Sequence, residues 1–537
     1  MPVEPTPLQH SSRRELLRLA GAIPFAGAVG GLPQSLLAAT EGQRQIAGYK
    51  PAQLPSVETL GKWLQQLHEF GPIRMTGTPQ CRAFEEFLAT QFAALGFTVE
   101  RDQFRLTSWE CRITDCSISV VEDGGATRTV EVVAYYPFGG STRGKPAATG
   151  RLLYVPGIGV DAAKALADAT SAEGLANSIV VMDMPLVRSA RVARTAPPAP
   201  LGHFPEKLPE RVGGPSPSGQ SGREIMEVFE NRCKGLIMCY TDISNDTARH
   251  NYLPFSDKHR TLPAIWAGAE GSAYLKSVSG KATATIRCDA KLTPDARADT
   301  ILATLKGQSD EVVFLTTQTD GPNECNENGG LGVLAVATYW SKIPANQRRR
   351  TLVCSLPTAH YAMGAVMDKK TGSGRRGGTR GVLDKWPDMA KRIVGQIAME
   401  QMGAMDWVEL NGTFAPSGNV APERWIPTPA TQETSARMFL AATVGEDPRY
   451  SNVTITPEFG APGEGGSVRS LGLPGIGLMG QPAYFFRADP KGVIDKLNPN
   501  VMHNQVAFAT KMSLLMDRLT PDQLHGKAPI TDSDLYG

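Results

Sequence analysis

Residues 311–330, EVVFLTTQTDGPNECNENGG, gather many side chains that can hold a metal ion or hydrogen-bond a ligand. They are carboxylates, amides and one thiol: Gln318, Asp320, Asn323, Glu324, Cys325, Asn326, Glu327 and Asn328. The apolar, β-branched run before them, 312–315, predicts a buried strand that ends in a Gly/Pro/Asn loop. Ligands bind at the carboxyl ends of the strands in open α/β sheets. We therefore expect the functional site in this loop.

The segments around the loop alternate between strand and helix patterns, which predicts an α/β fold with a mixed, mostly parallel sheet flanked by helices. Apolar residues at helical spacing predict helices over 56–70, 82–95, 332–342, 388–394, 431–444 and 501–519. Runs rich in β-formers predict strands over 97–100, 301–305, 312–316, 351–356 and 397–399.

A central block has a different character. Short β-rich runs at 151–155, 178–182, 235–239 and 264–266 surround one helical stretch near 225–231 and a long Pro/Gly-rich excursion at 196–222. We expect an inserted β-rich domain over 139–290, while 41–138 and 291–537 together form the α/β domain. A chain of 537 residues is long enough for two or three domains.

The amino terminus has the pattern of a twin-arginine export leader. Arg13 and Arg14 precede a mild apolar stretch, 19–37, which Gly and Pro interrupt. We expect residues 1–40 to be a signal peptide and the mature protein to be periplasmic or extracellular. No other stretch is apolar for long enough to cross a bilayer. The net charge of +2 and 20% charged residues do not point to nucleic acid as a partner.

Eight cysteines stand at positions 81, 111, 116, 233, 239, 288, 325 and 354. In an oxidising compartment the pairs 111/116 or 233/239 could close small loops, but spacing alone does not define the connectivity. None has zinc-finger spacing, and most are expected to be small buried apolar residues.

Several segments resemble metallopeptidase family 28, the co-catalytic zinc exopeptidases, in the subset with an inserted protease-associated domain. GPIRMTGTPQCRAFEEFLATQFAALGFTVE (71–100) resembles the opening segment of the family, and KGLIMCY followed by TLPAIWAG resembles the end of a protease-associated domain. GLPGIGLMG and YFFRADPKGVIDKL resemble the closing segments. The resemblance implies the exopeptidase fold over nearly all of the mature chain.

Enzymes of this family hold two zinc ions with His, Asp, Glu, Asp and His and use another Glu as the general base, which are the residue types that metal-assisted hydrolysis needs. Here the first His-x-Asp aligns with the stretch QTD, so Asp320 is kept while Gln318 offers only a weak amide ligand. The bridging Asp aligns with Glu327. The base and the ligand that follows it align with Ala359 and His360.

The later metal-binding Asp aligns with Glu400, and the closing His aligns with Phe485, which cannot coordinate a metal. Glu464 stands where the family has an Asp near its substrate-facing loop. Loss of a general base alone typically costs a factor of about 10²–10⁴ in rate. A conventional two-zinc aminopeptidase is therefore not expected.

Two functions remain open. The first is an exported binding or repurposed protein that takes a small-molecule or peptide ligand in a polar cleft lined by Gln318, Asp320, Glu327, His360, Glu400 and Glu464. The alternative is an amide or peptide hydrolase with one divalent ion, manganese or calcium sooner than zinc, held by Glu327, His360 and Glu400 with Asp320 or Gln318. Glu324 or Glu464 would then act as the base.

A third arrangement uses Cys325 as nucleophile and His360 as base. The basic, Gly-rich run 369–380 is expected to be a mobile surface loop.

Overall fold

The computed structural model of the chain describes residues 45–184, 219–421, 423–425, 432–451, 453–455, 464–466, 475–480 and 482–537. The expected signal peptide, 1–40, and the part of the Pro/Gly-rich excursion that precedes 219 lie outside the described residues.

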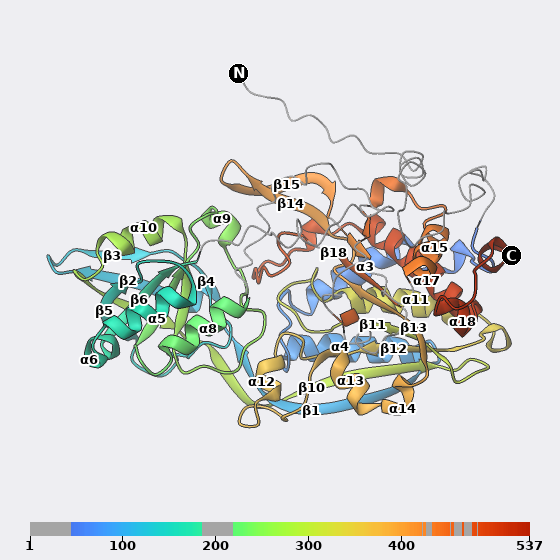
Figure 1. Ribbon diagram of the computed structural model, residues 1–537, viewed down its shortest axis with the longest axis horizontal. Coiled ribbons are helices and arrows are strands. Elements are labelled where there is room, and N and C mark those ends of the chain that lie inside the picture. The colour runs from blue at the N-terminus through green and yellow to red at the C-terminus, as the bar shows by residue number, and fades with distance from the viewer. Residues whose placement is uncertain are drawn as a thin grey trace, which may run out of the picture.

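The body is built on a sheet for which eight strands are described, in the order β1-β10-β12-β11-β13-β18-β16-β17 (Figure 1). The strands are β1 (Thr98–Glu110), β10 (Lys291–Leu305), β12 (Thr351–Leu356), β11 (Val312–Thr316), β13 (Ile393–Glu400), β18 (Gly475–Gly480), β16 (Glu423–Trp425) and β17 (Val453–Ile455). The central four, β12, β11, β13 and β18, are parallel, while β1 and β10 extend one edge in antiparallel pairing. The expected mixed sheet is confirmed.

Alternation along β11 explains why helices cover both faces of this sheet. Val313 and Leu315 point into a core shared with the helices α3 (Val57–Glu69), α4 (Pro79–Ala94), α11 (Gly329–Ser341) and α17 (Pro499–Arg518). Val312 and Phe314 pack instead against α13 (Gly378–Lys385) and α14 (Pro387–Ala390). Both faces are therefore closed, and the carboxyl ends of the parallel strands are left to carry the site.

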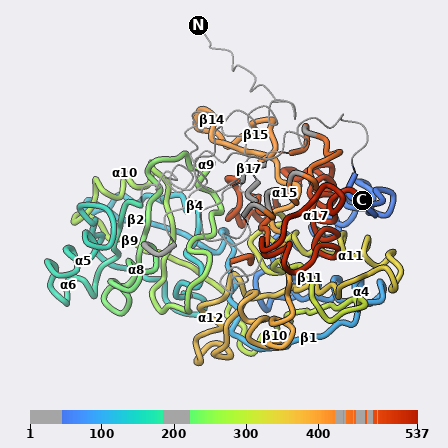
Figure 2. Tube along the Cα trace, turned by 45° about the vertical axis from the view of Figure 1, so that its right-hand side comes forward, coloured from blue at the N-terminus to red at the C-terminus, as the bar shows by residue number. Residues whose placement is uncertain are grey.

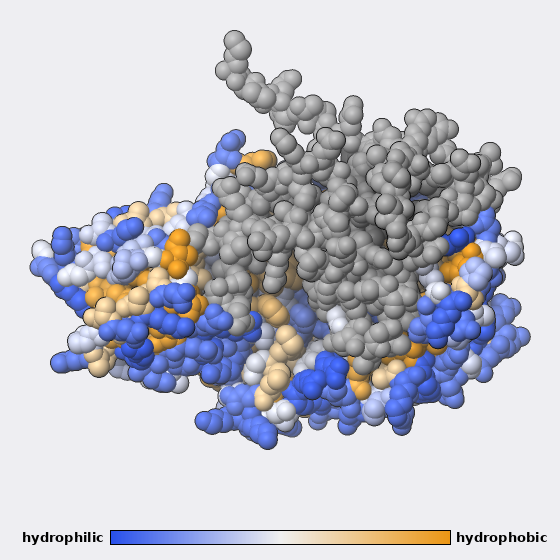
Figure 3. Space-filling model, viewed as in Figure 1, coloured by the Kyte–Doolittle hydropathy of each residue, from blue (hydrophilic) through white to orange (hydrophobic). Residues whose placement is uncertain are grey.

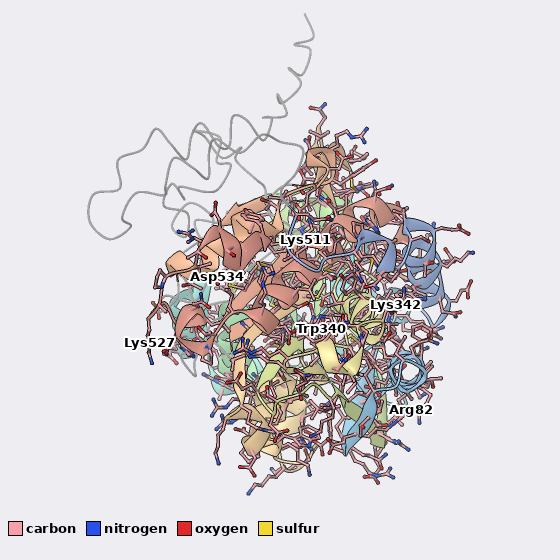
Figure 4. All side chains as sticks on the ribbon, turned by 90° about the vertical axis from the view of Figure 1, so that its right-hand side faces the viewer. Arg82, Trp340, Lys342, Lys511, Lys527 and Asp534 are labelled. Carbon is pink, nitrogen blue, oxygen red and sulfur yellow. The ribbon has the colours of Figure 1, made fainter. Side chains whose placement is uncertain are left out.

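Polar contacts join the helices on the first face. Trp340 of α11 donates through Nε1 to Ser513 Oγ of α17 at 2.8 Å. Lys511 of α17 donates to the carbonyls of Ala442 and Val444, at 3.0 and 2.7 Å, at the end of α15 (Gln432–Ala442) and just after it. Figure 4 labels Trp340 and Lys511 within this helical layer.

A second sheet forms the inserted β-rich domain, with eight described strands in the order β3-β2-β9-β5-β6-β7-β8-β4 (Figure 1). They are β2 (Cys116–Glu122), β3 (Thr127–Val130), β4 (Val132–Tyr135), β5 (Ala148–Tyr154), β6 (Ser178–Asp183), β7 (Gly235–Cys239), β8 (Ala264–Ala267) and β9 (Ala282–Cys288). The sheet thus begins near residue 116, not at the expected 139. The early strands belong to it because β2 pairs along its whole length with β9 and buries Ile118 and Val120.

One local expectation was wrong and a second holds only in part. The helix predicted over 388–394 is only the short α14, because Ile393 and Val394 already belong to β13 and are buried beside β11. The basic run 369–380 is not a free loop over its whole length: α13 begins at Gly378, and Arg375 pairs with the buried Asp102 of β1. In both segments, contacts with residues distant in sequence determine the structure: β11 for Ile393 and Asp102 for Arg375.

The inserted domain is joined to the body by backbone hydrogen bonds as well as by its two chain connections. Tyr252 N donates to Phe486 O, and Ala488 N donates to His250 O, both at 2.6 Å. Asp246 accepts from the backbone of Phe414 at 2.8 Å, in the hairpin of β14 (Met405–Leu410) and β15 (Thr413–Val420). Figure 2 shows the two parts of the chain side by side.

The described surface visible in Figure 3 is largely hydrophilic, and many of its apolar residues lie on the inserted domain at the left of the view. Ile158 and Met367, exposed by 64% and 54%, lie on different parts of the chain. Isolated apolar side chains of this kind are ordinary on a protein surface. Within the described ranges, no helix combines the length and the apolar character that a bilayer span needs.

Candidate functional site

The loop after β11 is the centre of a buried polar cluster. The side chains that the sequence indicates there are all fully buried: Gln318, Asp320, Asn323, Glu324, Cys325, Asn326, Glu327 and Asn328. His360 follows β12, Glu400 ends β13, and Glu464 lies beside both. Buried polar groups need partners, so the hydrogen bonds of this cluster define what it can do.

Asp320 organises the turn after β12. Its carboxylate accepts from Thr76 Oγ1 at 2.6 Å and from the backbone N–H groups of His360 and Tyr361 at 3.0 and 2.8 Å. Ala359, just before them, has a φ of 67°, in the left-handed region, so the two successive N–H groups form an anion-binding turn. Burial raises the pKa of Asp320, while these donors oppose the shift. All three hydrogen-bond donors to the Asp320 carboxylate are therefore groups of the protein.

His360 and two carboxylates form a second group. His360 Nδ1 donates to Glu464 Oε1 at 2.7 Å, and Glu464 N donates to Glu400 Oε1 at 2.8 Å. Burial by itself lowers the pKa of His360, but the hydrogen bond to Glu464 and the nearby carboxylates raise it to about 9. Burial raises the pKa of Glu400 to about 7, so this carboxyl can change its protonation state near neutral pH.

Arg74 is the principal site residue that is not among the candidate site residues predicted from the sequence. It is fully buried, and its guanidinium forms an ion pair with Glu327 and donates to the carbonyls of Leu67, at 3.0 Å, and Gly71. Burial lowers its pKa to about 10, which leaves it cationic at neutral pH. The only sequence signal is its place in GPIRMTG, within the segment that resembles the opening of family 28.

The backbone explains how Arg74 reaches the site. Arg74 N donates to Gly321 O at 3.0 Å and Gly321 N donates to Arg74 O at 2.9 Å, so the segment before α4 pairs with the site loop. A Cβ at position 321 would lie 2.3 Å from Glu327 Oε2, a contact that only glycine avoids. Gly321 therefore lets Glu327 approach the loop closely.

Gln318, which aligns with a zinc-binding histidine of family 28, belongs to a network of amide side chains. Gln318 Nε2 donates to Asn326 Oδ1, and Asn326 Nδ2 donates to Tyr361 Oη and, at 3.1 Å, to Phe485 O. Gln318 Oε1 is buried and has no hydrogen-bond partner among the described residues. The network fixes the side chain of Gln318 toward another amide.

Two of the candidate catalytic residues have structural roles. Glu324 pairs with His68 of α3 and accepts from Val493 N at 2.7 Å, which ties the loop to two other segments. Cys325 is fully buried in an apolar cluster with Tyr484 and Val493, and burial raises the pKa of its thiol. A nucleophilic thiolate needs the opposite environment. The arrangement of Cys325 as nucleophile and His360 as base is therefore not supported.

Aromatic rings border the group around His360. Phe255, from the inserted domain, stacks on the imidazole of His360 with ring centres 5.5 Å apart, and it also contacts Tyr361 and Phe486. Phe485 packs edge-on against Phe486 at 4.2 Å. The side chain of His360 is 16% exposed, so this rim is where the cluster meets solvent.

The metal-ligating side chains of the candidate site do not form a cluster in the part of the chain that the structure describes. Among the described residues, one group of three or more His, Cys, Asp or Glu side chains has ligand atoms within 4.8 Å of one another, and it lies elsewhere, at Cys111, Cys116 and Cys288. At the candidate site the Arg74 guanidinium already contacts Glu327. A cation beside this carboxylate would be repelled by the guanidinium.

Solved structures of peptidases are similar to this chain over most of its length. An aminopeptidase from Aneurinibacillus sp. strain AM-1 matches with 14% identity over 87% of this chain and 95% of its own, at a TM-score of 0.54. A peptidase M28 precursor from Shewanella amazonensis matches with 14% identity over 86% and 96%, at 0.55. A zinc aminopeptidase from Bacillus subtilis matches with 12% identity over 86% and 95%, at 0.55. No family model and no curated protein matches.

The fold is thus the metallopeptidase family 28 fold, as the resemblance in sequence implied. At 12–14% identity the similarity is one of fold, and function has to be argued from the residues at the site.

Glu85 of α4 is a second residue that the sequence does not reveal, and it provides a test of the buried electrostatics near Asp320. It is 1% exposed, accepts from Cys81 Sγ at 3.4 Å and Asp299 N at 3.3 Å, and burial followed by the charge of Asp299 raises its pKa to about 8. The folded protein therefore keeps a proton that the unfolded chain releases above about pH 4.5. The contribution of Glu85 to the free energy of unfolding is therefore full below about pH 4.5 and is lost as the pH rises toward 8.

We expect wild-type protein to lose on the order of 3 kcal/mol of unfolding free energy between pH 4.5 and 8 through this group, and Glu85→Gln to abolish that part of the pH dependence. Urea unfolding at pH 5 and pH 8 measures it. Glu86→Gln, at an exposed neighbouring position, is the matched control and should follow wild type. Identical pH slopes in wild type and Glu85→Gln would contradict the expectation.

Proposed function

We propose that this chain is an exported protein that has kept the exopeptidase body but uses the site at the end of β11 to bind a small-molecule or peptide ligand, instead of hydrolysing peptides with two zinc ions. The observation that carries the proposal is the buried ion pair between Arg74 and Glu327. Glu327 aligns with the carboxylate that bridges the two metals in family 28. A guanidinium supplies fixed positive charge to that carboxylate and removes its need for a metal.

The other substitutions point the same way. The residue aligned with the general base is Ala359, whose methyl group has no proton to exchange and whose backbone is in the left-handed region. Phe485 aligns with the closing histidine, and its ring packs on Phe486. Loss of the base alone lowers a hydrolytic rate by about 10²–10⁴. A chain with these residues lacks two groups that the family uses, the aligned general base and the closing histidine ligand.

The ligand that suits this site carries positive charge or several hydrogen-bond donors. The buried carboxylates of Glu464 and Glu400 lie next to the partly exposed His360, and the rings of Phe255 and Phe486 offer faces to a cation or an apolar group. Phe255 comes from the inserted domain, which supports the view that this domain, with its protease-associated-like sequence, shapes access to the site.

The proposal is tested on protein purified from the periplasm. We expect no turnover on aminoacyl or dipeptide substrates above background, before or after treatment with a chelator, and metal content that is unchanged by Glu327→Ala. A thermal-shift screen of cationic amines and short peptides should find a stabilising ligand whose effect is lost in Glu464→Gln. Asp310→Asn, at an exposed position, is the control. Turnover that is abolished by chelation and by Glu327→Ala would overturn the proposal.

One observation favours a second function, an amide or peptide hydrolase with a single metal ion. Hydrogen bonds connect His360 to Glu464 and Glu464 to Glu400, so the three residues form one chain of contacts. The pKa of Glu400, about 7, suits proton transfer near neutral pH. This function requires metal-dependent turnover that Glu400→Gln removes, so the same substrate screen separates it from ligand binding alone.

A further inference from the structure

Three cysteines meet at the junction between the body and the inserted domain. Cys111 directly follows β1, Cys116 is the first residue of β2, and Cys288 is the last residue of β9, shortly before β10 begins at Lys291. The cluster therefore lies where the chain leaves the body sheet and also where it returns. Cys116 and Cys288 are opposite each other in the β2–β9 pairing.

The sulfur atoms converge as metal ligands do. Cys111 Sγ lies 3.6 Å from Cys116 Sγ and 3.9 Å from Cys288 Sγ, and all three lie within 4.8 Å of one another. A metal–sulfur bond of about 2.3 Å in tetrahedral or trigonal geometry separates the sulfurs by about 3.8–4.0 Å. Small rotations of the side chains would thus place the three sulfurs around one ion.

The backbone around the cluster is held in place without the metal. Cys288 N donates to Thr142 Oγ1 at 2.8 Å, and Thr142 N donates to Cys288 O at 2.9 Å. Asp289 N donates to Asp115 O at 3.0 Å, which joins the outgoing and the returning segments beside the cysteines. Such support fixes the direction of the ligands before any ion binds.

We propose that Cys111, Cys116 and Cys288 form a thiolate site for one soft d¹⁰ cation, Cu⁺ or Zn²⁺, which fastens the inserted domain to the body. Thiolate ligands select these ions. Three sulfurs complete a trigonal site for Cu⁺, whereas Zn²⁺ would add water as a fourth ligand at the partly exposed Cys116. On binding, each thiol gives up its proton to the buffer as its metal–sulfur bond forms.

A disulfide or a packed set of neutral thiols would behave differently from a metal site. A disulfide would use two of the sulfurs and leave the third as a free thiol. Three neutral thiols that pack as small apolar groups would bind no ion. The twin-arginine route proposed for this protein exports chains that fold in the reducing cytosol, where the thiols meet a metal before they meet an oxidant.

The test uses full-length protein, reduced and stripped of metal under anaerobic conditions, then titrated separately with Zn²⁺ and with Cu⁺. We expect one equivalent of one or both ions to bind, with affinity at least tenfold lower in Cys111→Ser, Cys116→Ser and Cys288→Ser. Cys233→Ser changes a partly buried cysteine of the same domain outside the cluster and should bind as wild type does. Equal binding by wild type and the three cluster variants would overturn the proposal.

Alkylation of unmodified protein gives a readout that does not depend on the folding of variants. The bound ion should slow the reaction of Cys111, Cys116 and Cys288 with iodoacetamide at least tenfold and leave the rate of Cys233 unchanged, as measured by peptide mass spectrometry. Ion-independent alkylation of the cluster, or a disulfide within it in metal-free protein taken directly from the periplasm, would refute the site. Comparison of the two ions decides which of them the site takes.

Discussion

Arg74→Met is expected to lower the free energy of unfolding by about 3–5 kcal/mol, because it leaves the carboxylate of Glu327 buried without a compensating charge. The carbonyls of Leu67 and Gly71 lose their donor in the same substitution. Urea unfolding followed by tryptophan fluorescence measures the loss. Arg82→Met, at an exposed position on α4, is the matched control and should change stability by no more than about 0.5 kcal/mol.

A double-mutant cycle separates the ion pair from the other contacts of Arg74. Glu327→Leu alone should also be strongly destabilising, since it leaves the guanidinium buried and unpaired, whereas the double variant should lose clearly less than the sum of the two single changes. Additive losses, or a loss below about 1 kcal/mol in Arg74→Met, would contradict the role of the pair.

Asp320→Ala is expected to cost about 3–5 kcal/mol, because three buried donors lose their acceptor together: Thr76 Oγ1 and the N–H groups of His360 and Tyr361. Loss of the carboxylate also releases the turn that contains Ala359. Hydrogen exchange should accelerate at the amides of His360 and Tyr361 more than elsewhere in the body. Asp310→Ala, where the side chain is 71% exposed, should leave both stability and exchange nearly unchanged. Unaltered exchange at these two amides in Asp320→Ala would show that the turn does not depend on the carboxylate.

The sheet could be predicted because its strands carry strong local signals. The runs at 312–316 and 351–356 are short, apolar and β-branched, and both are strands with the expected bounds. The prediction for 388–394 was wrong because its helical spacing competes with pairing beside β11, which depends on residues far along the chain. The early strands of the inserted domain, 116–135, were placed in the body for the same reason: their partner, β9, is distant in sequence.

The grouping of the candidate site residues was predictable, but their contacts were not. Strand order brings the residues after β11, β12 and β13 together, so Asp320, His360 and Glu400 could be grouped from sequence. The pairing of Arg74 with Glu327 depends on a backbone bridge between positions 74 and 321, which the sequence does not encode locally. Glu324 and Cys325 have structural roles because of their burial and their hydrogen-bond partners, and neither can be inferred from the residue type alone.

The strand-like pairing of 250–252 with 486–488 has a consequence for the history of this architecture. Phe255 and Phe486 stack on each other across this contact, although one belongs to the inserted domain and the other to the body. A lineage that discarded the insert would lose Phe255 from the aromatic border around His360 and expose the backbone at 486–488. The insert and the body are therefore expected to be inherited together, as one evolutionary unit.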